Sequence, residues 1–211
     1  QFLLFGFAMG ASTGMWIPVA RAFGSGDLRA TRRAVAAGAI ISATIATAIT
    51  LIGIFGSGAL LTLLGTPAEL MDDAQTFLGV LFAGAVATVA FNFLSSMIRA
   101  LGDSRTPLVF LIIASVLNVG LVVLFIAVFK LGVGGAALAT VVAQAISVVL
   151  CLVLIGMRIP ELRLRRADWR VGRLELGEAS RLGLTMGFQM SVIAIGASLL
   201  QVGINHLGTD A

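Results

Sequence analysis

The stretch Phe91–Thr140 reads FNFLSSMIRALGDSRTPLVFLIIASVLNVGLVVLFIAVFKLGVGGAALAT and decides the fold class of this chain. An apolar segment enters a short polar loop at residues 99–107, and a second apolar segment leaves that loop at once and ends at Lys130. A glycine-rich turn at residues 132–135 then opens a third apolar segment. Hydrophobic runs of about 20 residues separated by such tight turns are typical of helices that cross a lipid bilayer.

The composition of the whole chain fits this class. Hydrophobic residues make up 59% of the 211 residues, charged residues make up only 11%, and the mean hydropathy of +1.07 is far above that of a soluble domain. Nucleic-acid binding is not indicated, because the arginines lie in loops between apolar segments. The single cysteine, Cys151, excludes a disulfide within the chain. No signal-peptide n-region precedes the first apolar run, so we interpret the chain as a fragment of a longer membrane protein.

Six membrane-spanning helices are predicted, which makes the chain an all-α membrane protein with a polytopic transmembrane helical bundle. The glycines at 53, 56 and 58 are expected to end the second helix and to leave residues 59–64 at the membrane interface. Residues 66–73 then form a turn with three carboxylates, which we expect to be solvated and to hold no metal. The predicted spans are approximately 2–20, 34–58, 76–98, 107–129, 133–157 and 182–205.

The basic residues predict the orientation in the membrane. The loops at 21–33, 99–106 and 158–181 hold every lysine and arginine except Lys130. Such an asymmetry between alternate loops places the basic loops on the cytoplasmic side of the cell membrane. Residues 158–181 also alternate seven arginines with leucines, Trp169 and four acids, which indicates a segment that lies on the membrane surface.

Two patterns predict local packing. Gly6, Gly10 and Gly14 recur every four residues, so they share one face of the first helix and allow another backbone to approach closely. In the polar loop, Gly102 fits the end of one helix, while Thr106 and Pro107 fit the N-cap and first position of the next.

Neutral polar residues share helix faces on the predicted spans. For a single stripe, hydrogen bonds between helices are a sufficient explanation, although these average only ~0.6 kcal/mol per pair. Several stripes that converge indicate a polar pathway through the bundle. No acidic residue lies in the middle of a span and no catalytic set is spaced for chemistry, so an enzyme is not expected. The candidate pathway residues are Asn92, Asn118, Thr140, Gln144 and Gln201.

The order and spacing of these motifs resemble the multidrug and toxic compound extrusion (MATE) family. The resemblance lies in RALGDSRTP at 99–107 (with Arg99, Gly102, Asp103 and Pro107), LN at 117–118 and GVGGAALAT at 132–140. It extends to ARAFGSGD at 20–27 and NHLGTDA at 205–211, so it covers nearly the whole chain.

The resemblance implies twelve helices in two six-helix lobes that form a V around a central cavity. It implies an antiporter that exchanges Na⁺ or H⁺ for a bulky, often cationic, organic compound by alternating access, with no cofactor beyond that ion. Residues 1–157 would be the N-terminal lobe without its first helix, 158–181 a linker, and 182–211 the first helix of the C-terminal lobe. The chain's partners would then be the missing first helix, the rest of the C-terminal lobe and membrane lipid.

The resemblance also implies a possible cation site. In one branch of the family, an asparagine on the fifth helix and an aspartate four residues later join a threonine on the sixth helix. Asn118 and Thr140 match that pattern, but Val122 stands in place of the aspartate, which argues against direct Na⁺ binding and leaves H⁺ coupling. Two alternatives to a drug exporter are a lipid-linked oligosaccharide flippase of the same superfamily and a membrane scaffold subunit that transports nothing.

Overall fold

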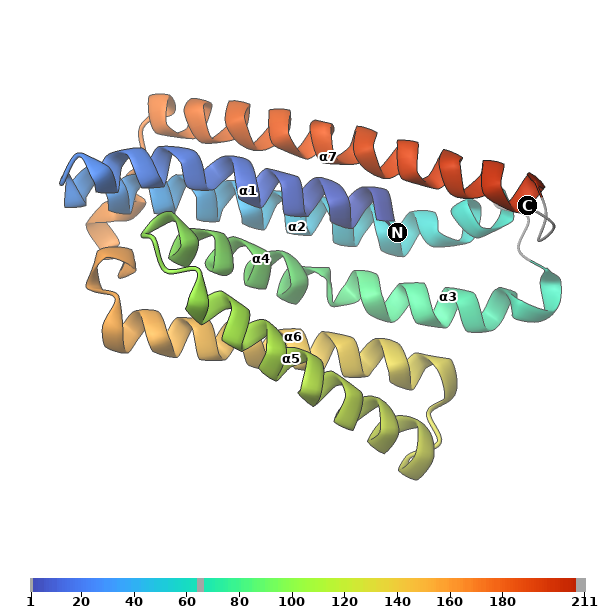
Figure 1. The fold of residues 1–211 in the computed structure, drawn as a ribbon. Helices are drawn as coiled ribbons and strands as arrows, with labels where there is room; N and C mark the ends of the chain where they lie inside the picture. Colours follow the sequence, from blue (N-terminus) through green and yellow to red (C-terminus); the bar gives the residue numbers. More distant parts are fainter. Residues whose placement is uncertain (1, 64–66, 208–211) are drawn as a thin grey trace.

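The computed structural model describes residues 2–63 and 67–207, with side chains at all of these except 2, 60, 63, 68 and 198–207. The chain folds into long helices that run back and forth along one axis (Figure 1). Short π and 3₁₀ helices at Leu124–Val128, Pro160–Leu162 and Arg166–Trp169 lie between them. The long helices are α1 (Phe2–Gly24), α2 (Leu28–Leu63), α3 (Ala68–Ala83), α4 (Ala85–Ala100), α5 (Arg105–Val123), α6 (Gly132–Arg158) and α7 (Arg173–Leu207).

The lengths and hydropathies of these helices fit a membrane bundle. Within the described residues, four helices are long and apolar enough to cross a bilayer, and the bent pair α3 and α4 makes a fifth crossing if it counts as one. The sixth predicted span belongs to α7, which does not reach that criterion over its described residues. The helical membrane class predicted from the sequence is therefore confirmed, and the predicted bounds 107–129 and 133–157 match α5 with its π turn and α6 closely.

Helix α2 corrects the predicted end of the second span. The helix begins at Leu28 and continues through Gly53, Gly56 and Gly58 to Leu63, so the glycines do not end it. Gly53 instead accommodates the ring of Phe82, whose atoms a Cβ at this position would overlap. A helix keeps its backbone hydrogen bonds inside a bundle, so tertiary packing outweighs the low helix propensity of glycine.

The third predicted span is two helices. Helices α3 and α4 meet at Gly84 with a bend of 44°, and α3 begins eight residues earlier than predicted, at Ala68. A Cβ on Gly84 would overlap the side chain of Val141, so α6 packs directly against the bend. The carboxylates of Glu69, Asp72 and Asp73 were predicted to lie in a connecting turn. They lie exposed in the first two helical turns of α3 instead, and acidic groups at the start of a helix complement its dipole.

The turn between α4 and α5 is capped by a different residue from the one predicted. Gly102 has φ +91° and ends α4 in the left-handed region, as the sequence predicts. Asp103, not Thr106, caps the next helix, because its carboxylate accepts hydrogen bonds from the backbone N–H groups of Arg105 (3.1 Å) and Thr106 (3.0 Å). Helix α5 consequently begins at Arg105, and Pro107 is its third residue.

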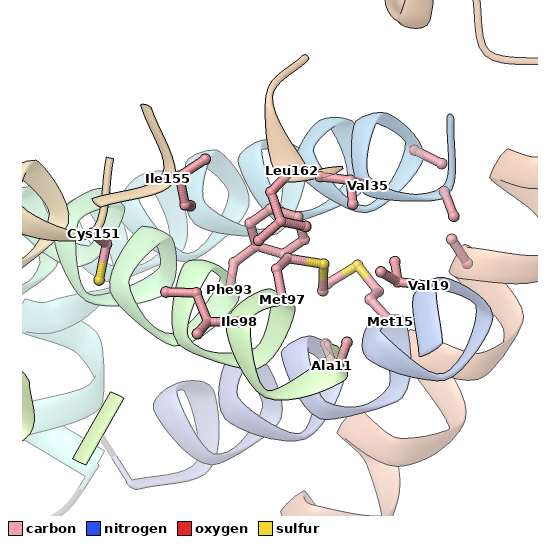
Figure 2. Packing of buried hydrophobic residues seen from close by; sticks show 14 of the residues in the cluster. Ala11, Met15, Val19, Val35, Phe93, Met97, Ile98, Cys151, Ile155 and Leu162 are labelled. Carbon is pink, nitrogen blue, oxygen red and sulfur yellow. The ribbon is translucent and has the colours of Figure 1, made fainter. Parts of the chain in front are cut away.

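Helices α1, α2, α4 and α6 share one core, which the segment after α6 completes. Met15 of α1, Val35 of α2 and Met97 of α4 meet in this cluster, and Leu162 packs over them from the 3₁₀ turn at 160–162 (Figure 2). The linker is thus folded against the bundle. Helix α7 begins at Arg173, inside the range 158–181 that was predicted as linker, and the residues before it form two 3₁₀ turns.

Candidate functional site

The polar pair predicted between the fourth and fifth spans is formed. Asn118 of α5 donates a hydrogen bond from Nδ2 to Oγ1 of Thr140 on α6 at 3.2 Å. Thr140 Oγ1 in turn donates to the carbonyl oxygen of Ala136, one turn earlier, at 3.2 Å. The tight connection that brings the two helices together contains Lys130 and Gly132, both with positive φ. Both side chains of the pair are half-buried, so the pair lies at the boundary of the α5–α6 contact rather than deep in a core.

Gln144 extends this pair along α6. It lies one turn after Thr140 on the same face, and its Oε1 is buried without a hydrogen-bond partner. A buried acceptor that lacks a donor costs about 1–3 kcal/mol, so a proton-donating group at this point would be stabilised. Asn118 and Thr140 together with Gln144 are called the α5–α6 polar cluster below.

Of the other predicted pathway residues, Asn92 does not join this cluster. The Nδ2 of Asn92 donates to the carbonyl oxygen of Thr88 in its own helix at 2.9 Å. The Oγ of Ser95, one turn further on, is buried and has no partner. The side chain of Gln201 lies outside the described residues. The stripes on α4 and α6 are thus present, and among the predicted pathway residues whose side chains the structure describes, only Asn118 and Thr140 are joined by a hydrogen bond between helices.

The α5–α6 polar cluster contains no formal charge. Val122, one turn after Asn118, adds none, and the described acidic residues lie at helix ends or in loops. Over the part of the chain that the structure describes, no three His, Cys, Asp or Glu residues gather as a metal site would require. The cluster can donate and accept hydrogen bonds, yet it cannot balance a cation by charge.

The polar loop of the sequence signature stabilises the turn at one end of the bundle. Arg99 at the end of α4 donates from Nη2 to Oγ of Ser96 at 3.3 Å. Asp103 accepts a hydrogen bond from the Thr106 hydroxyl at 2.5 Å, and this bond, with the Thr106 backbone N–H, lowers the pKa of the Asp103 carboxyl. The signature residues therefore have a local structural role.

The predicted glycine face packs against α7. A Cβ on Gly10 would overlap the carbonyl oxygen of Met186, and a Cβ on Gly14 would overlap that of Leu182. Gly6 is less crowded, since its Cβ would lie 3.8 Å from the Cβ of Ala194. The glycine spacing thus permits a close backbone approach, as predicted, between α1 and the last helix of the chain (Figure 1).

Helix α7 contributes glycines to the same contact, which sequence reasoning missed. A Cβ on Gly187 would lie 2.7 Å from the ring of Phe7, and a Cβ on Gly183 would lie 3.2 Å from Met15 Cγ. The repeat at 183 and 187 has the same four-residue period as the glycines of α1, so this signal was available in the sequence.

Charged groups join α7 to α1 and to α2 at the end of the bundle that carries the basic loops. Arg21 Nη1 lies 2.6 Å from Oε1 of Glu178, and Arg33 Nη1 lies 3.8 Å from Oε1 of Glu175. These groups line a polar depression of about 570 Å³ between α1, α2 and α7. The sequence did not predict these pairs, because their partners are far apart in the chain.

Comparisons with known proteins agree with this fold. The family model described as MatE matches residues 1–124. The probable multidrug resistance protein YpnP of Bacillus subtilis (strain 168) is 39% identical over 158 residues, which are 74% of this chain and 35% of that protein.

Solved structures give the same result for the arrangement of the helices. An inward-facing multidrug resistance MATE transporter of the MOP superfamily superposes with a TM-score of 0.85 at 24% identity, over 92% of this chain and 44% of that one. An outward-facing MATE family transporter superposes with a TM-score of 0.86 at 23% identity, over 94% of this chain and 44% of that one. The chain therefore spans less than half the length of these relatives, and on the match to its first 124 residues it belongs to the MatE family of multidrug and toxic compound extrusion proteins.

Proposed function

We propose that this chain is part of a cation-coupled antiporter that exports small organic, often cationic, compounds across the cell membrane by alternating access. The single observation that carries the proposal is the α5–α6 polar cluster, an uncharged set of polar side chains on two apolar helices of a MatE-family bundle, in which Asn118 and Thr140 are hydrogen-bonded. Polar groups in such helices favour a wet pathway over lipid.

In this proposal the α5–α6 polar cluster supports the coupling step and does not bind the ion by itself. A hard cation held by neutral oxygens alone is bound weakly, because the charge of the ligands helps to set affinity. Gln144 presents a buried oxygen without a donor, which suits the O–H of a protonated carboxyl. We therefore assign proton coupling, with an acidic residue outside this chain as the group that is protonated.

Electrostatics favour a neutral or cationic substrate over a lipid-linked oligosaccharide. The lysines and arginines of the described chain lie at helix ends and in loops, so none faces the α5–α6 polar cluster. An anionic pyrophosphate-linked substrate would be stabilised by basic groups along its path. The proposal also places the basic loops, which gather at one end of the bundle, on the cytoplasmic side.

The test uses the full-length protein in proteoliposomes with ethidium as the transported dye. Efflux should follow an imposed pH gradient at zero Na⁺ and should fall in Asn118→Ala. Ser115→Ala is the matched control, because Ser115 lies on the same helix but donates only to the carbonyl of Leu111. Efflux that follows Na⁺ at fixed pH would contradict proton coupling, and no efflux under either gradient would contradict the antiporter.

A further inference from the structure

An apolar cavity of about 540 Å³ lies between α2, α4 and α6, apart from the α5–α6 polar cluster. Val35, Ser42 and three alanines of α2 line it, together with Val86, Phe93 and Met97 of α4 and Leu152 of α6. Figure 2 shows Phe93 and Met97 in the core beneath the 3₁₀ turn that carries Leu162. The cavity is partly open to the outside of the described helices.

The length of this cavity matches one leaflet of a bilayer. Its lining on α2 extends from Val35 to Ala46 and its lining on α4 extends from Val86 to Met97. Each stretch covers about 16 Å at the rise of an α-helix. The hydrocarbon core of a bilayer is about 30 Å thick, so the cavity reaches from one surface to about the midplane.

A charged and an aromatic side chain mark the end of the cavity near the basic loops. Arg163 is the one charged residue among the described residues that line it. Its Nε donates to the carbonyl oxygen of Ile155 at 3.3 Å, which positions the guanidinium at the end of α6. Trp169, which is 51% exposed, lines the same end, and tryptophan is enriched at the level of lipid head groups.

The linker that carries these two residues is held in place by the bundle. Arg32 of α2 donates from Nη2 to the carbonyl oxygen of Pro160 at 2.9 Å, and the side chain of Leu162 is buried. Arg163 and Trp169 are therefore presented by an ordered segment, at the polar end of a groove that is otherwise apolar.

We propose that this groove binds a phospholipid with an anionic head group from the leaflet that faces the basic loops. One acyl chain occupies the apolar groove, and the phosphate lies against the guanidinium of Arg163 with Trp169 beside the glycerol region. Arginine pairs with phosphate through parallel N–H donors, and basic groups near a membrane surface attract anionic lipid. A cationic substrate is disfavoured here, because it would meet the like charge of Arg163.

The test measures quenching of Trp169 fluorescence by lipids brominated on their acyl chains. A variant of the full-length protein, in which Trp16 and any tryptophan outside this chain are replaced by phenylalanine so that only Trp169 remains, is placed in phosphatidylcholine vesicles. These vesicles contain brominated phosphatidylglycerol or brominated phosphatidylcholine. Brominated phosphatidylglycerol should quench Trp169 at a mole fraction about fivefold lower than brominated phosphatidylcholine does. This is the preference expected from one well-placed basic group. Arg163→Gln should remove that preference, and Arg163→Lys should keep most of it.

Two further variants distinguish lipid binding in the groove from attraction of lipid to general surface charge. Arg166→Gln removes an exposed arginine of the same linker that does not line the cavity, so it should leave the preference unchanged. Ala43→Phe places a ring in the groove from an exposed position, so it should weaken quenching by both lipids. Each variant is first checked for a monodisperse peak in size-exclusion chromatography.

Several results would overturn the proposal. Equal quenching by both lipids, or equal effects of Arg163→Gln and Arg166→Gln, would show that head groups bind only to diffuse surface charge. Unchanged quenching in Ala43→Phe would show that no chain enters the groove. Quenching by neither lipid would show that protein covers it, whether another part of the polypeptide or a second copy. Protection of Trp169 by ethidium would assign the groove to a transported compound instead.

Discussion

Arg21 in the last turn of α1 and Glu178 in the second turn of α7 form an ion pair 2.6 Å long between residues 157 positions apart. The Arg33–Glu175 pair lies beside it, at 3.8 Å. Helix α7 is the predicted start of the second lobe, so these pairs join that helix to the first lobe at one end of the bundle. The Arg21 and Glu178 side chains are 68% and 40% exposed, so the pair contributes only about 0–1 kcal/mol.

The first prediction tests whether this contact opens during transport. Arg21→Glu should change the rate of ethidium efflux by up to about fivefold, because about 1 kcal/mol shifts a two-state equilibrium by that factor. Arg21→Glu combined with Glu178→Lys should restore the rate. Arg29→Glu, a nearby exposed residue, serves as control. A double variant no better than the single one would show that the pair does not act in the cycle.

The second prediction separates function from packing at Asn118. Loss of its hydrogen bond to Thr140 should lower the free energy of unfolding by only ~0.6 kcal/mol, the average for such bonds in membranes. Asn118→Ala should therefore keep a thermal midpoint close to that of the parent while efflux falls about tenfold or more, which corresponds to at least about 1.4 kcal/mol. Thr140→Ser keeps the hydroxyl and should retain most activity. A large drop in the midpoint would make Asn118 a structural residue.

The third prediction concerns the contact between α1 and α7. Gly10→Leu should sharply reduce the yield of folded full-length protein, because even a Cβ at this position overlaps the carbonyl of Met186. Gly10→Ala should destabilise as well, by about 1–3 kcal/mol, the usual cost of overpacking. Gly6→Ala is the matched control, since its Cβ would lie at an ordinary 3.8 Å. Yield and thermal midpoint are the measurements, and equal behaviour of Gly6→Ala and Gly10→Ala would contradict the close crossing.

The fourth prediction is a pH dependence at the α4–α5 turn. The hydroxyl and N–H of Thr106 lower the pKa of Asp103 below its ordinary value of 3.8. A lowered folded-state pKa means that the carboxylate stabilises the fold above the unfolded-state pKa, and that this stabilisation is lost as pH falls through the folded-state pKa. The Asp103→Asn variant should therefore be less stable than the parent at pH 7. The difference between their thermal midpoints should be smaller in strong acid. Thermal midpoints at pH 7 and pH 3 provide the comparison, and a constant difference would count against the capping role.

The fifth prediction concerns membrane topology. Ser25 lies in the turn between α1 and α2, whereas Asp72 lies in the first turns of α3, at the other end of α2 (Figure 1). Single cysteines at these positions in a Cys151→Ala parent should react with an impermeant thiol reagent from opposite sides, with Asp72→Cys labelled from outside intact cells. Labelling of both from outside would contradict the predicted orientation of the basic loops.

The sequence by itself determined the class of the fold, the approximate position of most spans and the gathering of arginines in alternate loops. These features follow from the length and hydropathy of each segment taken by itself. A bilayer accommodates apolar segments of spanning length, so no contact with a distant segment is needed to predict them. The Asn118–Thr140 pair was also predictable, because a short turn between consecutive helices leaves few possible registers. The functional role of that pair stays a proposal.

Only the tertiary structure decided where helices bend, continue and cross. Gly53 lies inside a continuous helix because Phe82 packs on it, whereas Gly84 marks a 44° bend against Val141. The same residue type thus gives opposite outcomes, and the choice depends on a neighbour far away in the chain. The crossing of α1 with α7 and the groove that ends at Arg163 have the same origin, because contacts between distant segments cannot be read from local periodicity.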